Sequence, residues 1–170
     1  ALGRRLGGTA PDALYASDLR RAWDTAQAIA AAVGLEAQPE PRLREVAFGA
    51  WEGLTYAQIS QRYPKAVAAW QADPFGVAPP EGEGLGDLVA RVRAALDDLL
   101  RQHPEGRALV VGHGGVLQVL LCLAFDLDPG RRWQFRLDPA SVSELSVYPA
   151  GPILSLLNDT GHLREEGEWA

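Results

Sequence analysis

The sequence predicts an α/β fold, a three-layer sandwich built on a mostly parallel sheet. Short apolar runs alternate along the chain with longer segments whose apolar residues recur at helical spacing. The apolar run at residues 108–111 is nearly continuous, as in strands that are covered on both faces. Further apolar runs follow closely near the end of the chain, and they favour antiparallel strands added to the sheet.

Local signals set the boundaries of the expected elements. Ser17 is expected to cap a helix that Gly34 ends, and Thr55 to Gln58 has the pattern of a capping box. Pro64 suits the first turn of another helix. Expected strands are 13–16, 35–38, 108–111, 133–137, 142–148 and 153–157. Expected helices are 2–6, 19–33, one that begins at 55, 64–72, a long one from 85 to 103, and 116–125.

The chain of 170 residues suits a single domain, residues 1–170, with a core of its own. The helices between Thr55 and His103 are expected to form a small helical cap, about residues 55–103, inserted at one edge. Residues 73–84 are rich in Pro, Gly and Glu, so they are expected to be a surface loop within this cap.

Composition excludes several classes of function. The formal net charge is −6 and no block of basic residues stands out, so no nucleic-acid partner is expected. No apolar run has the length that a bilayer crossing needs, so no membrane partner is expected either. Cys122 is the single cysteine, which excludes an internal disulfide and favours a cytoplasmic protein. No histidines or carboxylates have metal-ligand spacing, so no metal is expected.

Two glycine-rich or basic turns follow buried strands. Gly112-His113-Gly114-Gly115 turns a strand into a helix, at the sheet edge where ligands of open α/β sheets bind. Free N–H groups at this helix start suit a phosphate, and His113 is expected to project there, although a structural histidine gives the same pattern. Arg20 and Arg21 open the helix after Ser17, and they point about 100° apart. One of them can grip a phosphate, but arginines at a helix start are also common surface residues.

A third segment, residues 43–53, is neither a regular helix nor a strand. Large apolar residues alternate in it with glycines and with Glu45 and Glu52. Such a loop can hold a carboxyl group for general acid catalysis, or it can be a packed loop with solvated glutamates.

Together the three segments resemble the histidine phosphatase superfamily, whose members are phosphoglycerate-mutase-like. Residues 17–26 resemble its Ser-Asp-Leu-x-Arg-Ala-x-x-Thr-Ala block, residues 43–53 its Leu-x-Glu-x-x-Phe-Gly-x-Trp-Glu-Gly block, and residues 112–115 its Gly-His-Gly-Gly block. Pro80 to Glu83 is similar to a minor fourth block, in which Gly84 replaces a serine. Residues 158–163 resemble the usual end of the family.

The resemblance implies roles for particular residues. Arg21, His113 and the backbone of Gly114 would bind the phosphoryl group, and His113 would also stabilise its charge during transfer. Glu45 would protonate the leaving oxygen. The implied function is hydrolysis of a small phosphorylated metabolite through a phosphohistidine, with no cofactor. The oligomeric state stays open, with a homodimer as one option.

Family members begin with a strand that ends in Arg-His-Gly and carries the nucleophilic histidine. This sequence contains no Arg-His-Gly, so we expect that roughly 30 or more residues precede Ala1 in the intact protein. Three alternatives remain: a phosphoglycerate mutase, a non-catalytic phosphate-binding module, and an enzyme in which His113 itself is the nucleophile. The 68 residues from Glu45 to His113 are few for a mutase of the family, and this favours a phosphatase.

Overall fold

The structure is a computed structural model, and it describes residues 1–163. At its centre is a parallel sheet of three strands in the order β2–β1–β3. The strands are β1 (Ala13–Ala16), β2 (Ala37–Pro39), β3 (Ala108–Val111), β4 (Val142–Tyr148) and β5 (Gly151–Asp159). The helices are α1 (Leu2–Leu6), α2 (Arg20–Val33), α3 (Tyr56–Arg62), α4 (Pro64–Ala72), α5 (Leu85–Gln102) and α6 (Gly114–Ala124).

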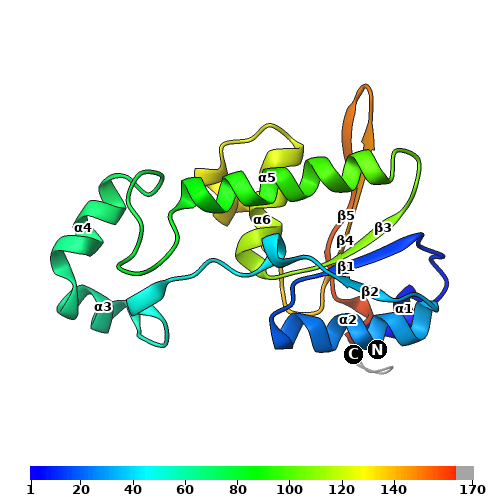
Figure 1. The fold of residues 1–170 in the computed structure, drawn as a ribbon, viewed down its shortest axis with the longest axis horizontal. Helices are drawn as coiled ribbons and strands as arrows, with labels where there is room; N and C mark the ends of the chain where they lie inside the picture. The colour runs from blue at the N-terminus through cyan, green and yellow to red at the C-terminus, as the bar shows by residue number, and fades with distance from the viewer. Residues whose placement is uncertain (164–170) are drawn as a thin grey trace, which may run out of the picture.

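Helices cover both faces of the sheet, which confirms the predicted α/β sandwich (Figure 1). Side chains of β1 alternate between the two faces, as the pleat requires. Ala13 and Tyr15 pack into a core with α5 and α6, while Leu14 and Ala16 pack against α1 and α2. All four residues of β1 are buried, so the central strand holds both layers together.

Strand β3 differs from its prediction as a strand buried on both faces. Each of its four residues is only half-buried, although they contact both core clusters. The reason is its position: within residues 1–163, β3 pairs with β1 along one side and has no strand along the other. Its exposure therefore comes through the edge of the sheet rather than through a face.

The predicted antiparallel strands form a sheet of their own. Strands β4 and β5 pair with each other, with Leu145 opposite Leu154, and not with the parallel strands. The hairpin extends past the end of α5 in Figure 1. Its apolar side chains Val147, Tyr148 and Ile153 are exposed.

Helices α3 and α4 stand away from the sandwich as a small extension (Figure 1). The predicted capping box is present, because the Thr55 and Gln58 side chains exchange hydrogen bonds with each other's backbone N–H groups. Pro64 occupies the first turn of α4 as expected. Helix α5, which the prediction also included in the cap, packs on the sheet. The division into one domain and a cap therefore stays a prediction.

Two predicted features are wrong. Ser17 is not the N-cap of α2, which begins at Arg20 with Leu19 before it, because the Ser17 side chain turns inward to the sheet edge. The expected strand 133–137 is absent, and a 3-10 helix covers Pro129–Gln134 instead. Asp128 initiates that helix, since its carboxylate accepts the N–H of Gly130 and Pro129 presets the first turn.

The other boundaries lie within a few residues of their predictions. Gly34 ends α2 in the left-handed conformation, with φ of 74°, which glycine adopts without strain. Strand β2 ends on Pro39, which an edge strand tolerates because proline lacks an N–H to donate. Across residues 1–163, none of the helices has the length and apolar character to cross a bilayer.

Candidate functional site

The carboxyl ends of β1 and β3 meet at one edge of the sheet. Ala16 lies opposite Val111 in register, and the N–H of Ser17 donates to the carbonyl of Val111 (2.9 Å). The residues after each strand therefore come together, as parallel topology requires. Nε2 of His113 lies 2.9 Å from Oγ of Ser17. Both side chains are buried, with 7% and 0% of their surface exposed.

The imidazole of His113 is held neutral by its surroundings. Burial lowers its pKa below the ordinary value, and the positive charges of Arg21 and Arg91 lower it further. The carboxylate of Glu45 acts in the opposite direction. The hydroxyl of Ser17 accepts the N–H of Leu19 (3.3 Å) and forms a second hydrogen bond with Nε2 of His113.

Arg20 and Arg21 diverge as the helical geometry predicts. The side chain of Arg20 is 94% exposed and pairs with Asp24 at 3.5 Å along the helix. Arg21 instead lines a large cavity between the start of α2 and the α3–α4 extension. The positive charge of Arg21 also contributes to the lowered pKa of His113.

Glu45 lies at the N-terminus of α6. Its Oε2 accepts the N–H of Gly115 (3.4 Å), and its Oε1 accepts the N–H of Val46 (3.0 Å). The positive end of the α6 dipole favours a carboxylate at this point. The absence of a side chain on Gly115 permits the approach, because a Cβ there would lie 2.7 Å from Oε1 of Glu45. Gly114 itself is exposed, with open space around its Cα.

The loop that carries Glu45 is fixed on both sides. The neighbouring Arg44 donates two hydrogen bonds to Asp18, one of them at 2.6 Å, and this holds the pKa of the Asp18 carboxyl below its usual range. The pair ties the Glu45 loop to the start of α2, so that Arg21 and Glu45 keep a fixed relation.

The segment before α5 supports the same loop from behind. Glu83 N–H donates to Ala47 carbonyl (2.7 Å), and the side chain of Glu83 accepts two hydrogen bonds from Arg91 of α5 (2.6 and 2.7 Å). Gly49, with φ of 53°, lies so close to residues 80–82 that a Cβ would collide with their backbone. Two loops that are distant in sequence are thus packed backbone against backbone.

The cavity has a volume of about 730 Å³, within the range of ligand pockets. Arg21 and Glu45 both line it, so the structure brings these two predicted residues together. His113 is not among the residues of the wall; it directly precedes α6, at whose start Glu45 accepts the N–H of Gly115. The remaining wall is mostly apolar and comes from the Glu45 loop, α3 and α4.

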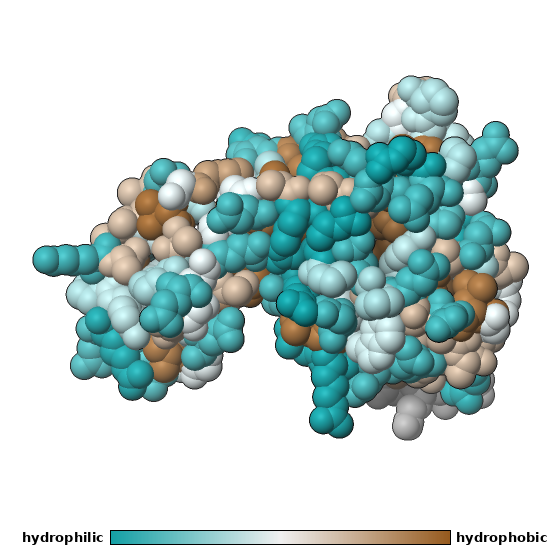
Figure 2. Space-filling model, viewed as in Figure 1, coloured by the Kyte–Doolittle hydropathy of each residue, from teal (hydrophilic) through white to brown (hydrophobic). Residues whose placement is uncertain are grey.

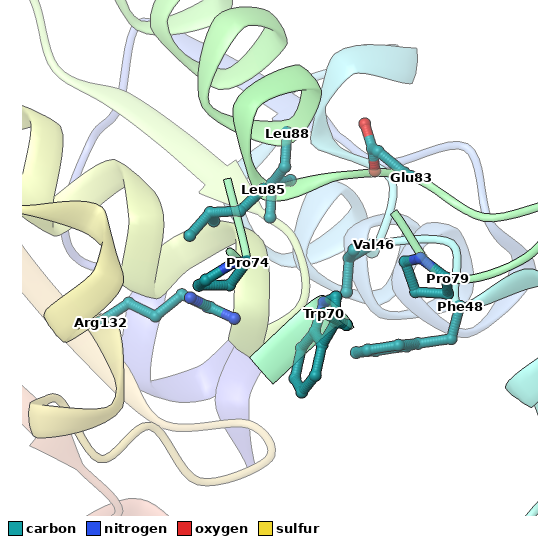
Figure 3. A pocket seen from close by; sticks show the side chains of 9 residues that line it. All are labelled: Val46, Phe48, Trp70, Pro74, Pro79, Glu83, Leu85, Leu88 and Arg132. Atoms are coloured by element: carbon teal, nitrogen blue, oxygen red, sulfur yellow. The ribbon is translucent and has the colours of Figure 1, made fainter. Parts of the chain in front are cut away.

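A second, much smaller cavity adjoins the first (Figure 3). It has about 20 Å³, room for about one water molecule. Figure 3 shows the guanidinium of Arg132 pointing toward Pro74 and Trp70. Arg132 is buried and stacks on the ring of Trp133 at 4.3 Å, and burial lowers its pKa.

Within residues 1–163, no three His, Cys, Asp or Glu side chains are grouped so that they could hold a metal ion. The groups that the described chain offers at the site are a guanidinium, a carboxylate, an imidazole and the N–H groups at the start of α6.

Comparison with known proteins identifies the family. Residues 1–160 match the model of the histidine phosphatase superfamily (branch 1), and the chain belongs to that superfamily. A relative from Hydrogenobacter thermophilus, phosphoserine phosphatase 1, is 30% identical over 154 residues, which are 91% of this chain and 73% of the relative. The solved structure of the alpha-ribazole phosphatase from Shigella flexneri superposes with a TM-score of 0.83 at 26% identity, covering 93% of this chain and 80% of the other.

A longer relative shows that such a domain can be part of a larger protein. A protein of Mycobacterium tuberculosis that is described as bifunctional is 38% identical over 160 residues. The match covers 94% of this chain, and the chain spans 43% of that relative's length. The relatives thus include phosphatases with different named substrates, and the substrate of this chain has to be inferred from its own residues.

Some residues around the site were not predicted from the sequence. Ser17 was predicted only as a helix cap, and its hydrogen bond with His113 was not predicted. The ion pair of Arg91 with Glu83 has no sequence signal beyond the Pro80 to Glu83 block. The apolar wall was predicted only as part of a cap, because helical spacing does not tell which face borders a cavity.

Proposed function

We propose that the protein is a phosphatase that hydrolyses a small phosphomonoester through a phosphohistidine intermediate. The observation that carries this proposal is the cavity that Arg21 and Glu45 share, together with the action of both charges on the pKa of His113. A guanidinium, a carboxyl group and an imidazole that feels both charges match the needs of phosphoryl transfer, which depends on positioning and charge stabilisation.

Each group then has a defined task. Arg21 binds the phosphoryl oxygens with its guanidinium, and His113 donates a hydrogen bond to them and takes up a proton as the dianion approaches. The acceptor nitrogen attacks phosphorus while the bond to the leaving oxygen breaks. Glu45 enters this step in its protonated form and gives its proton to that oxygen. Glu45 next takes a proton from water, which attacks the phosphohistidine and releases inorganic phosphate.

The histidine that accepts the phosphoryl group has not yet been assigned to a residue. We propose that it belongs to a segment preceding Ala1 in the intact protein, as the family's Arg-His-Gly implies. The half-buried edge of β3, which has no strand neighbour in residues 1–163, offers backbone groups with which such a segment can pair.

Two other functions would use the same phosphate-binding residues. The absence of Arg-His-Gly from the sequence favours a non-catalytic phosphate-binding module. A phosphoglycerate mutase would use the same residues, but it would transfer the phosphate back to its substrate rather than to water. An assay that measures phosphate release and isomerisation of 3-phosphoglycerate side by side distinguishes the two enzymes.

The test of the phosphatase is turnover by the intact protein, together with the Glu45→Gln variant. We expect kcat to fall roughly 10²–10⁴-fold, because the leaving oxygen loses its acid. Glu36→Gln, an exposed glutamate remote from the cavity, is the matched control and should keep wild-type kcat. Wild-type turnover by Glu45→Gln would exclude the proposed role of Glu45.

The intermediate is tested by stopping the reaction in alkali and locating the phosphohistidine by mass spectrometry. Labelling of a histidine before residue 1 supports the proposed acceptor, whereas labelling of His113 assigns the nucleophile to this residue. Phosphate binding without any labelling or turnover would mean a binding module.

A further inference from the structure

The wall of the 730 Å³ cavity is strongly apolar away from Arg21 and Glu45. Its apolar members come from Leu19 before α2, from the loop after Glu45 and from both helices of the extension. Those of the extension are Tyr56, Ile59, Val67 and Trp70. Figure 2 shows the molecule hollowed between the extension and the body, and the lining residues come from these two sides.

The charged residues of the cavity wall indicate which charge the leaving group of the substrate can carry. Among the described residues that line the cavity, Arg21 is the one cation, and Glu45 and Glu52 are acidic. A bound phosphoryl group occupies the guanidinium of Arg21. A substrate with a second negative charge, such as a carboxylate, would therefore meet two glutamates and no second cation among the described residues of the wall, which disfavours its binding there.

Size and shape point to a large leaving group. A phosphoryl group takes only a small part of the cavity, and an apolar space of this size gains free energy when an apolar group fills it. The rings of Trp51 and Trp70 meet edge to face, with centroids 5.7 Å apart and planes at 87°. Further aromatic rings pack well in such surroundings, since edge-to-face and offset contacts are favourable.

We propose that the substrate is a phosphomonoester whose leaving group is uncharged and aromatic, and that this group lies against Trp70, Ile59 and Phe48. The proposal rests on the phosphatase function in placing the phosphoryl group at Arg21. It assigns the α3–α4 extension to the recognition of the leaving group.

Binding of three phosphonates to the intact protein tests this substrate class without any turnover. The ligands are ethylphosphonate, 2-phenylethylphosphonate and 3-phosphonopropionate, which share the anion and differ in the attached group. We expect 2-phenylethylphosphonate to bind at least about tenfold more tightly than ethylphosphonate, from the apolar area that the ring buries. We expect 3-phosphonopropionate to bind no more tightly than ethylphosphonate. Equal affinity for the first two, or tighter binding of the third, would overturn the proposal.

Substitutions in the cavity wall test whether the α3–α4 extension causes the preference for 2-phenylethylphosphonate over ethylphosphonate. Trp70→Ala should reduce the ratio of the two affinities toward one, whereas Trp133→Ala, which removes an exposed tryptophan outside the cavity, should keep the wild-type ratio. Ile59→Lys adds a cation to the wall and should make 3-phosphonopropionate the tighter ligand over ethylphosphonate. This gain of affinity cannot arise from a misfolded extension, and its absence counts against the proposal.

Turnover of the corresponding phosphate esters distinguishes the two proposals. If the phenyl preference in binding holds and no ester is hydrolysed, the phosphatase function fails and the assignment of the cavity stands. If the esters are hydrolysed with equal kcat/KM, the phosphatase stands and the aromatic leaving group is excluded.

Discussion

His113 occupies the sheet edge as a buried, neutral imidazole, and its titration links the site to stability. Its pKa in the folded protein lies below the ordinary value of 6.5, first because of burial and then because of Arg21. Between the lowered pKa and 6.5 the unfolded chain binds more protons than the folded one. The free energy of unfolding therefore decreases as pH falls below 6.5, and this contribution is fully retained above that pH.

Urea unfolding at pH 7.5 and pH 5.5 measures this loss. We expect the wild type to lose more stability between the two pH values than His113→Gln, which cannot titrate. Direct titration by NMR should give a pKa for His113 below 6.5, and inorganic phosphate should raise it, since a bound anion favours the imidazolium. A His113 pKa at or above 6.5 in the free protein would contradict the buried position.

Gly115 determines how closely the carboxylate of Glu45 approaches the start of α6. In Gly115→Ala the new Cβ would lie 2.7 Å from Oε1 of Glu45, so the carboxylate has to move away from the start of α6. We expect kcat to fall about tenfold or more, since small displacements of catalytic groups are costly. In Gly114→Ala the Cβ meets no heavy atom within 4 Å, and a smaller loss of kcat is expected. Steady-state kinetics of the two variants make the comparison.

At the scale of elements, loops rather than strands hold the site in shape. The Glu45 loop is fixed by Arg44 to Asp18 and by residues 79–84, which Arg91 in turn fixes to α5. Arg91 also donates to the carbonyl of Arg42 (2.6 Å), so one guanidinium supports two segments. Its side chain and that of Glu83 are 20% and 18% exposed, so removal of one partner would leave the other largely buried without compensation.

Removal of that guanidinium tests the support. Arg91→Met should lower the free energy of unfolding by about 2 kcal/mol, because Glu83 and the carbonyl of Arg42 lose their partner. Arg101→Met removes an exposed arginine from the same helix and should change it by less than about 0.5 kcal/mol. Denaturant titration gives both values, and an equal effect of the two substitutions would exclude a supporting role for Arg91.

Sequence reasoning succeeded for elements whose signals are local. The capping box at Thr55, the proline of α4 and the glycine that ends α2 act within a few residues, so they are readable in the sequence. The strand expected at 133–137 failed because Asp128 and Pro129 start a turn that was not recognised. The pairing of β4 with β5 alone depends on non-local contacts that alternation of apolar residues cannot specify.

The same distinction applies to the site. The rule that ligands bind at the carboxyl ends of parallel strands pointed to the edge that carries His113, and the structure brings Arg21 and Glu45 to one cavity beside it. The partner of His113 was missed because Ser17 lies 96 residues away, and a cap was the nearer interpretation of a serine before a helix. Three-dimensional contacts of this kind leave no spacing signature.

At the scale of the whole molecule, we expect ligand binding to increase the free energy of unfolding. An anion that binds the folded protein alone raises the free energy of unfolding by about 2.7 kcal/mol at one hundred times its Kd. We expect inorganic phosphate to raise the Tm of the wild type and of Arg20→Ala, whose guanidinium is exposed. Arg21→Ala should lose most of the shift. Thermal unfolding with and without phosphate measures this, and equal shifts in both variants would remove Arg21 from the site.

The α3–α4 extension is attached lightly to the rest of the protein. Helix α3 has no buried residue and α4 has only Val67, while the amide of Gln71 donates to the hydroxyl of Tyr56 (2.7 Å) and ties the two helices together. The groups proposed to perform the reaction stand on other segments, at strand ends and in the loop before the extension. Residues 55–72 can therefore be exchanged as a unit. We expect that replacing this stretch with the equivalent stretch of a relative changes which alcohol the enzyme releases. Binding of the phosphoryl group should stay the same.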